Sequence, residues 1–446
     1  MKKFRLSAFL ILAFCLVLSI SPSAVAAEEG SCGPNATWRF EDGTLTISGS
    51  GLVTDLCWYD FHNQIQKVVV EPGIINLPEN AFQDCEFLTD VTLPEGFAHI
   101  GAFAFHNCKS LGAIQFPDTL SRIGQHAFSN SGITGITIPG RVGRIDNGTF
   151  DGCEKLLHVT LEEGVTFIGT SAFSDCKKLT EIILPDSLDT MGENAFQNCT
   201  SLSSIVLSPN LKVIPSRAFQ GCKSLKSVTL SPKTSRIEYE AFQNCHDLRS
   251  ITIPPSVQFI YGLPSTLEEV HISDLTAWCE ATHDSVFHCL RNAKLFLNGE
   301  LITDLVIPAG CEQIGEHAFH DYAYLKSVTI PEGVTGIAWC AFNGCQNLQQ
   351  ITLPHSLEAI GPNVFQNCSS LTQVTYLGTA EDLPNLLIGE HNDSLLAASW
   401  NFGPLGTALI VIDALRIGLL IACLIGSSVL IACLVIYIRQ KKYPFL

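Results

Sequence analysis

The chain has 446 residues and a net charge of −17 at pH 7, with 43 acidic residues against 26 basic ones. Nucleic acids are bound through clustered Lys and Arg, so this acidic balance argues against a nucleic-acid partner. Length alone would predict two or three globular domains, but internal repeats override that expectation, because each repeat packs only on its neighbours.

Residues 1–26 have the pattern of a secretory signal peptide. The basic start at Lys2, Lys3 and Arg5 precedes an apolar run, and the segment ends at Ala24-Val25-Ala26, a small-residue cleavage site. The sequence therefore predicts an exported protein.

Residues 27–64 are expected to cap the N-terminal end. Apolar residues alternate with polar ones at Trp38, Phe40, Leu45 and Ile47 around Asp42-Gly43, which predicts a β-hairpin. A hairpin here would cover the apolar face of the first repeat. Cys32 and Cys57 flank it, and the sequence leaves open whether they form a disulfide or remain free thiols.

A repeated unit fills most of the chain. An Ala, Val or Thr followed by Phe recurs at intervals of 22 or 23 residues, interrupted once by a gap of 77, at Phe82, Phe105, Phe128, Phe150, Phe173, Phe196, Phe219, Phe242, Phe319, Phe342 and Phe365. Such a period indicates a stacked solenoid. We expect one elongated, β-rich array with parallel strands, made of repeats over 65–266 and 302–376 and modified repeats with an insertion over 267–301.

Each unit contains one strand pattern, seen in Leu88, Val91 and Leu93. The last two apolar residues share the inward face, so the residue between them points outward. It is usually Thr, interrupted by Gln115, Ile183, Val206 and His271. The candidate ligand-binding residues on this expected concave face are Thr92, Thr137, Thr160, Thr229, Thr252, Thr329 and Thr352. Solenoids generally bind through such a face, although the β-propensity of Thr predicts the same residues.

Nine cysteines share one repeat position, three residues after the Phe: Cys85, Cys108, Cys153, Cys176, Cys199, Cys222, Cys245, Cys345 and Cys368. Neighbours in this column would lie about 4.8 Å apart with parallel side chains. That arrangement favours buried thiols over disulfides, and a line of sulfurs does not suit tetrahedral zinc.

The 77-residue gap holds the best candidate for chemistry, formed by Cys279, His283, His288 and Cys289. These residues could supply zinc ligands or, with Asp274 or Asp284, a Cys/His nucleophile pair. Their spacing matches no strong metal motif, and packing or a Cys279–Cys289 disulfide is the favoured interpretation. We therefore predict no catalytic residue, no metal, no cofactor and no enzymatic activity.

The C-terminal part is expected to anchor the chain. After a cap at 377–398 and a linker at 399–408 comes a membrane segment at 409–438, in which Ile417 to Ile438 carries no charge. Its 22 residues would span about 33 Å as a helix, enough for a bilayer core. Basic residues in the tail at 439–446 place that tail in the cytoplasm and the repeats outside.

The unit L-x-x-[VI]-x-[LI]-P, continued by I-G-x-x-A-F-x-x-C, resembles the BspA-type leucine-rich repeat over about Ile65 to Ala398. The resemblance implies a surface protein of a host-associated microbe, which binds an extracellular protein or a cell-surface ligand in adhesion. The alternative is an envelope-located enzyme or scaffold with its site in residues 271–289.

Overall fold

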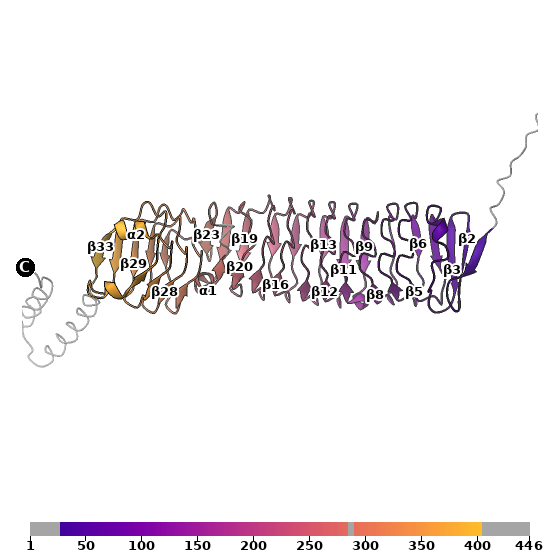
Figure 1. The fold of residues 1–446 in the computed structure, drawn as a ribbon, viewed down its shortest axis with the longest axis horizontal. Helices are drawn as coiled ribbons and strands as arrows, with labels where there is room; N and C mark the ends of the chain where they lie inside the picture. Colours follow the sequence, from indigo (N-terminus) through magenta and orange to yellow (C-terminus); the bar gives the residue numbers. More distant parts are fainter. Residues whose placement is uncertain (1–26, 284–289, 404–446) are drawn as a thin grey trace, which may run out of the picture.

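The computed structural model describes residues 27–283 and 290–403, which form a rod of stacked coils (Figure 1). The predicted β-solenoid with coils of about 23 residues is confirmed. In the view of Figure 1 the rod is nearly straight, so the expected concave face is one long side of the rod.

The expected signal peptide at 1–26 and membrane segment at 409–438 lie outside the described residues. Among the helices of residues 27–283 and 290–403, none is long and apolar enough to span a membrane.

One long side of the rod carries the first ladder, which consists of parallel strands offset by one coil. In it Val159 lies opposite Ile136 on one side and Ile182 on the other. Its strands are β4 (Lys67–Val70), β6 (Asp90–Thr92), β9 (Gly135–Ile138), β11 (His158–Leu161), β13 (Glu181–Ile183), β15 (Ser204–Val206), β17 (Ser227–Thr229), β19 (Ser250–Ile253), β21 (Glu269–Ile272), β23 (Lys294–Leu297), β25 (Asp304–Val306), β27 (Ser327–Thr329), β29 (Gln350–Leu353), β31 (Gln373–Tyr376) and β33 (Ser399–Phe402).

A second long side carries the second ladder, built of two-residue strands whose first residue faces outward and whose second is usually buried. These strands are β5 (Asn76–Leu77), β7 (His99–Ile100), β8 (Arg122–Ile123), β10 (Arg144–Ile145), β12 (Phe167–Ile168), β14 (Thr190–Met191), β16 (Val213–Ile214), β18 (Arg236–Ile237), β20 (Phe259–Ile260), β22 (Thr282–His283), β26 (Gln313–Ile314), β28 (Gly336–Ile337), β30 (Ala359–Ile360) and β32 (Leu387–Ile388).

The remaining side of each coil is hydrogen-bonded to its neighbour without forming a strand. In the coil of Phe173, the backbone N–H groups of Ser171, Phe173 and Asp175 donate to carbonyl oxygens of the next coil at 2.8–2.9 Å. Ser171 and Asp175 have φ of 54° and 55°. Asn, Asp and Gly recur at the position of Asp175 because they tolerate this left-handed conformation best.

A column of stacked Phe rings fills the core. Phe173, Phe196 and Phe219 are buried, with ring centroids 5.4 and 5.5 Å apart and planes 3° from parallel. Burial of each ring contributes roughly 2 kcal/mol, so the column is a large share of what holds neighbouring coils together.

The Phe column has two parts, Phe82 to Phe242 and Phe319 to Phe365, and a tryptophan precedes each part. Trp58 stacks on Phe82 at 5.7 Å and donates from Nε1 to the Ala81 carbonyl at 2.8 Å. Trp278 donates in the same way to the Ala318 carbonyl at 3.0 Å, just before Phe319. Each indole therefore covers the start of a column.

The predicted column of buried thiols is confirmed. Cys199 donates from Sγ to the carbonyl of Phe173 in the preceding coil at 3.1 Å, and Cys222 donates to Phe196 at 3.1 Å. Burial raises the pKa of Cys199 well above its usual value, so it stays protonated. Cys32 is a buried free thiol and Cys57 an exposed one, so the structure does not contain the disulfide that the sequence left open.

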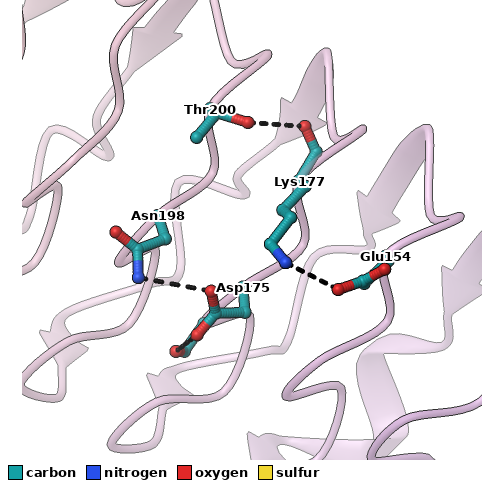
Figure 2. Close-up of polar contacts among 6 residues, drawn as sticks. Glu154, Asp175, Lys177, Asn198 and Thr200 are labelled. Carbon is teal, nitrogen blue, oxygen red and sulfur yellow. Dashed lines mark hydrogen bonds and ion pairs between the residues drawn. The ribbon is translucent and has the colours of Figure 1, made fainter.

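Polar side chains also join neighbouring coils at the surface (Figure 2). Asn198 donates from Nδ2 to Asp175 Oδ1 at 3.2 Å, Thr200 donates from Oγ1 to the Lys177 carbonyl at 3.1 Å, and Lys177 Nζ lies 2.6 Å from Glu154 Oε1. Exposed ion pairs contribute about 0–1 kcal/mol each. These contacts therefore support the register that the core and backbone impose.

The predicted N-terminal hairpin is confirmed. Strands β2 (Ala36–Glu41) and β3 (Thr44–Gly49) pair antiparallel through Asp42 and Gly43, whose φ angles are 47° and 76°. Strand β1 (Glu28–Ser31) pairs on the outer edge of β2, while β3 pairs parallel with β4. The hairpin thus begins the first ladder.

The C-terminal end differs from the sequence-based expectation. Residues 399–402, assigned to the linker, form β33 and pair parallel with β31. Trp400 packs against the core from this strand and donates from Nε1 to the Leu395 carbonyl at 3.1 Å, which ties β33 to helix α2 (Asp393–Ala397). The last coil therefore extends to Gly403.

Short 3-10 turns occur at Tyr59–Phe61, Gly140–Val142 and Leu383–Asn385.

Substituting Phe196→Ala in mid-array should cost about 3–5 kcal/mol of local stability, because it leaves a cavity between two stacked rings. Thr160→Ala, on the outward face, should leave thermal melting nearly unchanged. Circular dichroism melting of the two variants compares them directly, and equal shifts would contradict the assignment of inward and outward residues.

Candidate functional site

The candidate residues lie on the outward side of the first ladder, as predicted from the sequence. Five of them are exposed and Thr160 and Thr352 are half-buried, while the residues on either side of each in its strand pattern point inward. The structure therefore confirms their orientation. Their role in ligand binding stays a prediction.

The strand register brings these side chains into rows. Thr329, Thr352 and Thr375 are direct neighbours on β27, β29 and β31, and Thr137 pairs with Thr160. Parallel strands lie about 4.8 Å apart, so each row presents regularly spaced hydroxyl groups. A partner that follows the rod would meet the same contact at every coil.

Two of the residues that interrupt the Thr row form an exposed apolar patch. Ile183 is 52% exposed and Val206 68% exposed, and their strands β13 and β15 are neighbours. Thr160 pairs with Ile183 on one side, and Thr229 pairs with Val206 on the other. We call Thr160, Ile183, Val206 and Thr229 the central patch. Isolated exposed apolar residues are common, whereas adjacent ones on a flat sheet are typical of an interaction surface.

An aromatic pair on the same face was missed by sequence reasoning. His271 and Phe296 lie opposite each other on β21 and β23, with ring centroids 4.9 Å apart and planes 14° from parallel. His271 Nε2 is 3.2 Å from Glu269 Oε2. The sequence identified His271 only as an interruption. Phe296 was overlooked because its strand lies in a modified repeat, although the alternation of Leu295 and Leu297 around it was an available signal.

The insert brings Cys279 next to Cys311. Helix α1 (Leu275–Glu280) begins after Asp274, whose Oδ1 accepts a hydrogen bond from Ala277 N at 3.1 Å. This helix buries Cys279, and a hydrogen bond with Cys311 together with burial raises the pKa of Cys279 well above its usual value. This raised pKa keeps Cys279 as a thiol, which is a poor nucleophile.

His283 is also engaged elsewhere. Burial lowers the pKa of His283 to about 4, and its Nε2 donates to the Trp278 carbonyl at 3.0 Å. His288, Cys289 and Asp284 lie outside the described residues, as does any Cys279–Cys289 disulfide. Within residues 27–283 and 290–403, no group of three His, Cys, Asp or Glu could hold a metal ion.

The repeating coil with a strand on each ladder, a Phe column and a Cys column defines a leucine-rich-repeat solenoid, a class whose members typically bind other molecules rather than catalyse reactions. The sequence matches the model of the BspA type leucine rich repeat region at residues 50–157, 75–199, 144–263 and 292–387. The chain belongs to this family.

Three solved structures are similar to this chain, and the first of them supports the fold. A leucine-rich repeat protein from Bacteroides ovatus is 24% identical with a TM-score of 0.52, and the match covers 82% of this chain and 98% of that one. A leucine-rich repeat protein from Eubacterium ventriosum is 18% identical with a TM-score of 0.43, covering 84% and 95%. A leucine rich cell surface protein from Faecalibacterium prausnitzii is 21% identical with a TM-score of 0.34, covering 82% and 99%. The comparison with curated proteins gives no significant match.

His283 should make the stability of the insert depend on pH. Its pKa is lowered on folding from 6.5 to about 4, so the unfolded form binds the extra proton between these values. The stabilisation is complete above pH 6.5 and is lost as pH falls towards 4. At pH 5 the loss is about 2 kcal/mol relative to pH 7.5, or roughly thirtyfold in the opening equilibrium.

Hydrogen exchange of the α1 amides, corrected for intrinsic rates and read by mass spectrometry, measures that change. His283→Gln should remove the pH dependence of α1 amide exchange, whereas His158→Gln, at an exposed position, should leave it unchanged. A pH dependence that survives in His283→Gln would contradict the assignment.

Proposed function

We propose that this protein is anchored in a membrane, faces the cell exterior and binds another protein or a cell-surface ligand through its first ladder. The observation that carries the proposal is the central patch, where Ile183 and Val206 lie exposed side by side between Thr160 and Thr229. The alternative, an envelope enzyme or scaffold acting through residues 271–289, is disfavoured because Cys279 and His283 have partners other than each other.

The patch suits a modest contact that is repeated. Full burial of one Ile or Val contributes about 1.5–3 kcal/mol, part of which is offset by the entropy lost on association. One central patch would therefore bind weakly. The Thr rows along the rod and several copies on one surface would raise the overall avidity without any further type of contact.

The export signal and the membrane segment support the proposed location. In this organisation residues 1–26 direct export, residues 27–283 and 290–403 form the rod outside, and residues 409–438 cross the membrane. An acidic rod held outside a cell suits a role in adhesion to a host matrix or to other cells.

The double variant Ile183→Asp/Val206→Asp tests the proposal. Beads coated with the purified full-length protein are applied to immobilised fibronectin, to collagen and to an epithelial cell layer, and bound beads are counted. We expect the wild-type protein to bind at least one surface and the double variant to bind it at least tenfold less, because the carboxylates cannot be buried against an apolar partner.

Leu387→Asp is the matched control. Leu387 is 70% exposed and also lies on a strand, but on the second ladder. Its substitution should leave bead binding unchanged. Failure of the wild-type protein to bind any of the three surfaces, or equal losses in both variants, would refute the proposal.

A further inference from the structure

An open hollow of about 590 Å³ lies on the second ladder near the N-terminal end of the rod, away from the strands of the central patch. The outward residues of β5, β7, β8, β10 and β12 line it in sequence. In register, Asn76 is followed by His99 and Arg122, and Arg144 by Phe167, while β8 and β10 lie side by side. The Asn76 amide is paired with the Val53 backbone through both Oδ1 and Nδ2, so the row presents an imidazole, two guanidinium groups and an aromatic ring.

The hollow exists because its floor is backbone. Gly101 and Gly124 line it, and a Cβ on either would lie 2.4–2.5 Å from backbone atoms of the preceding coil. A side chain at either position would clash with the preceding coil, so both positions require glycine. The backbone N–H groups of Ala102 and Gln125, which also line the hollow, make no hydrogen bond within the described residues and can serve a ligand.

The two arginines are placed to bind an anion. Arg122 is exposed and has no ion-pair partner among the described residues. Arg144 lies over the Phe167 ring, with its guanidinium carbon 3.8 Å from the centroid, and its Nε is 4.0 Å from Asp146 Oδ1. The contact with the ring orients the guanidinium of Arg144. A guanidinium group can pair with a carboxylate through two parallel hydrogen bonds.

Two carboxylates in the same hollow restrict the class of ligand. Glu79 and Asp146 line it beside the arginines, and both accept hydrogen bonds but cannot donate them when ionised. A ligand with many negative charges would be repelled by these groups. A ligand with hydroxyl groups would donate to them while its single anionic group met Arg122 and Arg144.

We propose that this hollow binds a saccharide carrying one carboxylate, such as a sialic or a uronic acid. Arg122 and Arg144 hold the carboxylate, His99 contacts a ring substituent, and Glu79 and Asp146 accept from the sugar hydroxyls. The site is separate from the first ladder, so its occupation does not depend on the protein-binding role proposed above.

The test is isothermal titration of the full-length protein with sialyllactose, with a glucuronate-containing disaccharide, with lactose and with sodium sulfate. At least one of the two acidic sugars should bind at least tenfold more tightly than both lactose, which lacks the carboxylate, and sulfate, which lacks the hydroxyls. Equal affinity for lactose, stronger binding of sulfate, or no binding of either acidic sugar would overturn the proposal.

Two variants place the site. Arg122→Ala should lower the affinity for the acidic sugar at least tenfold. Arg122→Lys keeps the charge but loses the paired N–H donors of the guanidinium, so it should lower the affinity by a smaller factor.

Arg236→Ala is the matched control. Arg236 also lies over a ring on the second ladder, that of Phe259, but it pairs with Glu238 at 2.7 Å and does not line the hollow. Unchanged affinity in Arg122→Ala, with melting like wild type, or an equal loss in Arg236→Ala would refute the site.

The same sugar could be free or attached to a protein. Binding of a sialylated glycoprotein before and after sialidase treatment, compared with free sialyllactose, separates the two sources. Binding of the free trisaccharide alone would assign the site to soluble acidic sugars, and sialidase-sensitive binding of the glycoprotein would extend it to surface glycans.

Discussion

Backbone hydrogen bonding between successive coils is the constraint on which the rest of the structure depends. Each coil makes few such bonds within itself and exchanges most of them with its neighbours along both ladders and the remaining side. A single coil would leave these groups unpaired and its Phe exposed. The pairing between successive coils is therefore kept even where the coil length changes: Ser250 pairs with Glu269 and Glu269 with Lys294, so a shorter and a longer coil both stay in register on the first ladder.

One coil, residues 111–132, is a residue shorter than most. It contributes β8 to the second ladder, but within the described chain it forms no first-ladder strand between β6 and β9. Ile114 is still buried, and Thr134 N still bonds to the Gly112 carbonyl at 3.0 Å. The core of this coil is thus complete without a regular strand on that side.

The sequence was sufficient for features that depend only on the period. The inward Phe and Cys columns and the outward Thr residues follow from repeat position, because every coil places a given position at the same point. Contacts between residues at different repeat positions could not be predicted in this way. Cys279 lies beside Cys311 because α1 packs beside β26, and β33 closes the rod although it lacks the repeat pattern.

The hollow on the second ladder was missed for a related reason. Arg122 and Arg144 have no motif of their own and become a site only through the pairing of β7, β8, β10 and β12. In the sequence the glycines beneath them are only part of the repeated I-G-x-x-A-F pattern. Their effect on the surface depends on how closely the preceding coil approaches, which no pattern along the chain encodes.

Some residues depart from the repeat pattern, and their surroundings separate those with a packing role from those without one. Ser131 and Tyr322 depart from the Cys column, and each has a packing reason: Ser131 Oγ lies 3.4 Å from Cys153 Sγ, and Tyr322 donates to the Ile302 carbonyl at 2.6 Å. Ile183 and Val206 depart from the Thr row, yet their side chains are largely in water and contribute little to the core. Ile and Val favour strands as Thr does, so strand propensity accounts for all of these residues, and the exposed apolar surface of Ile183 and Val206 is what the proposed partner would cover.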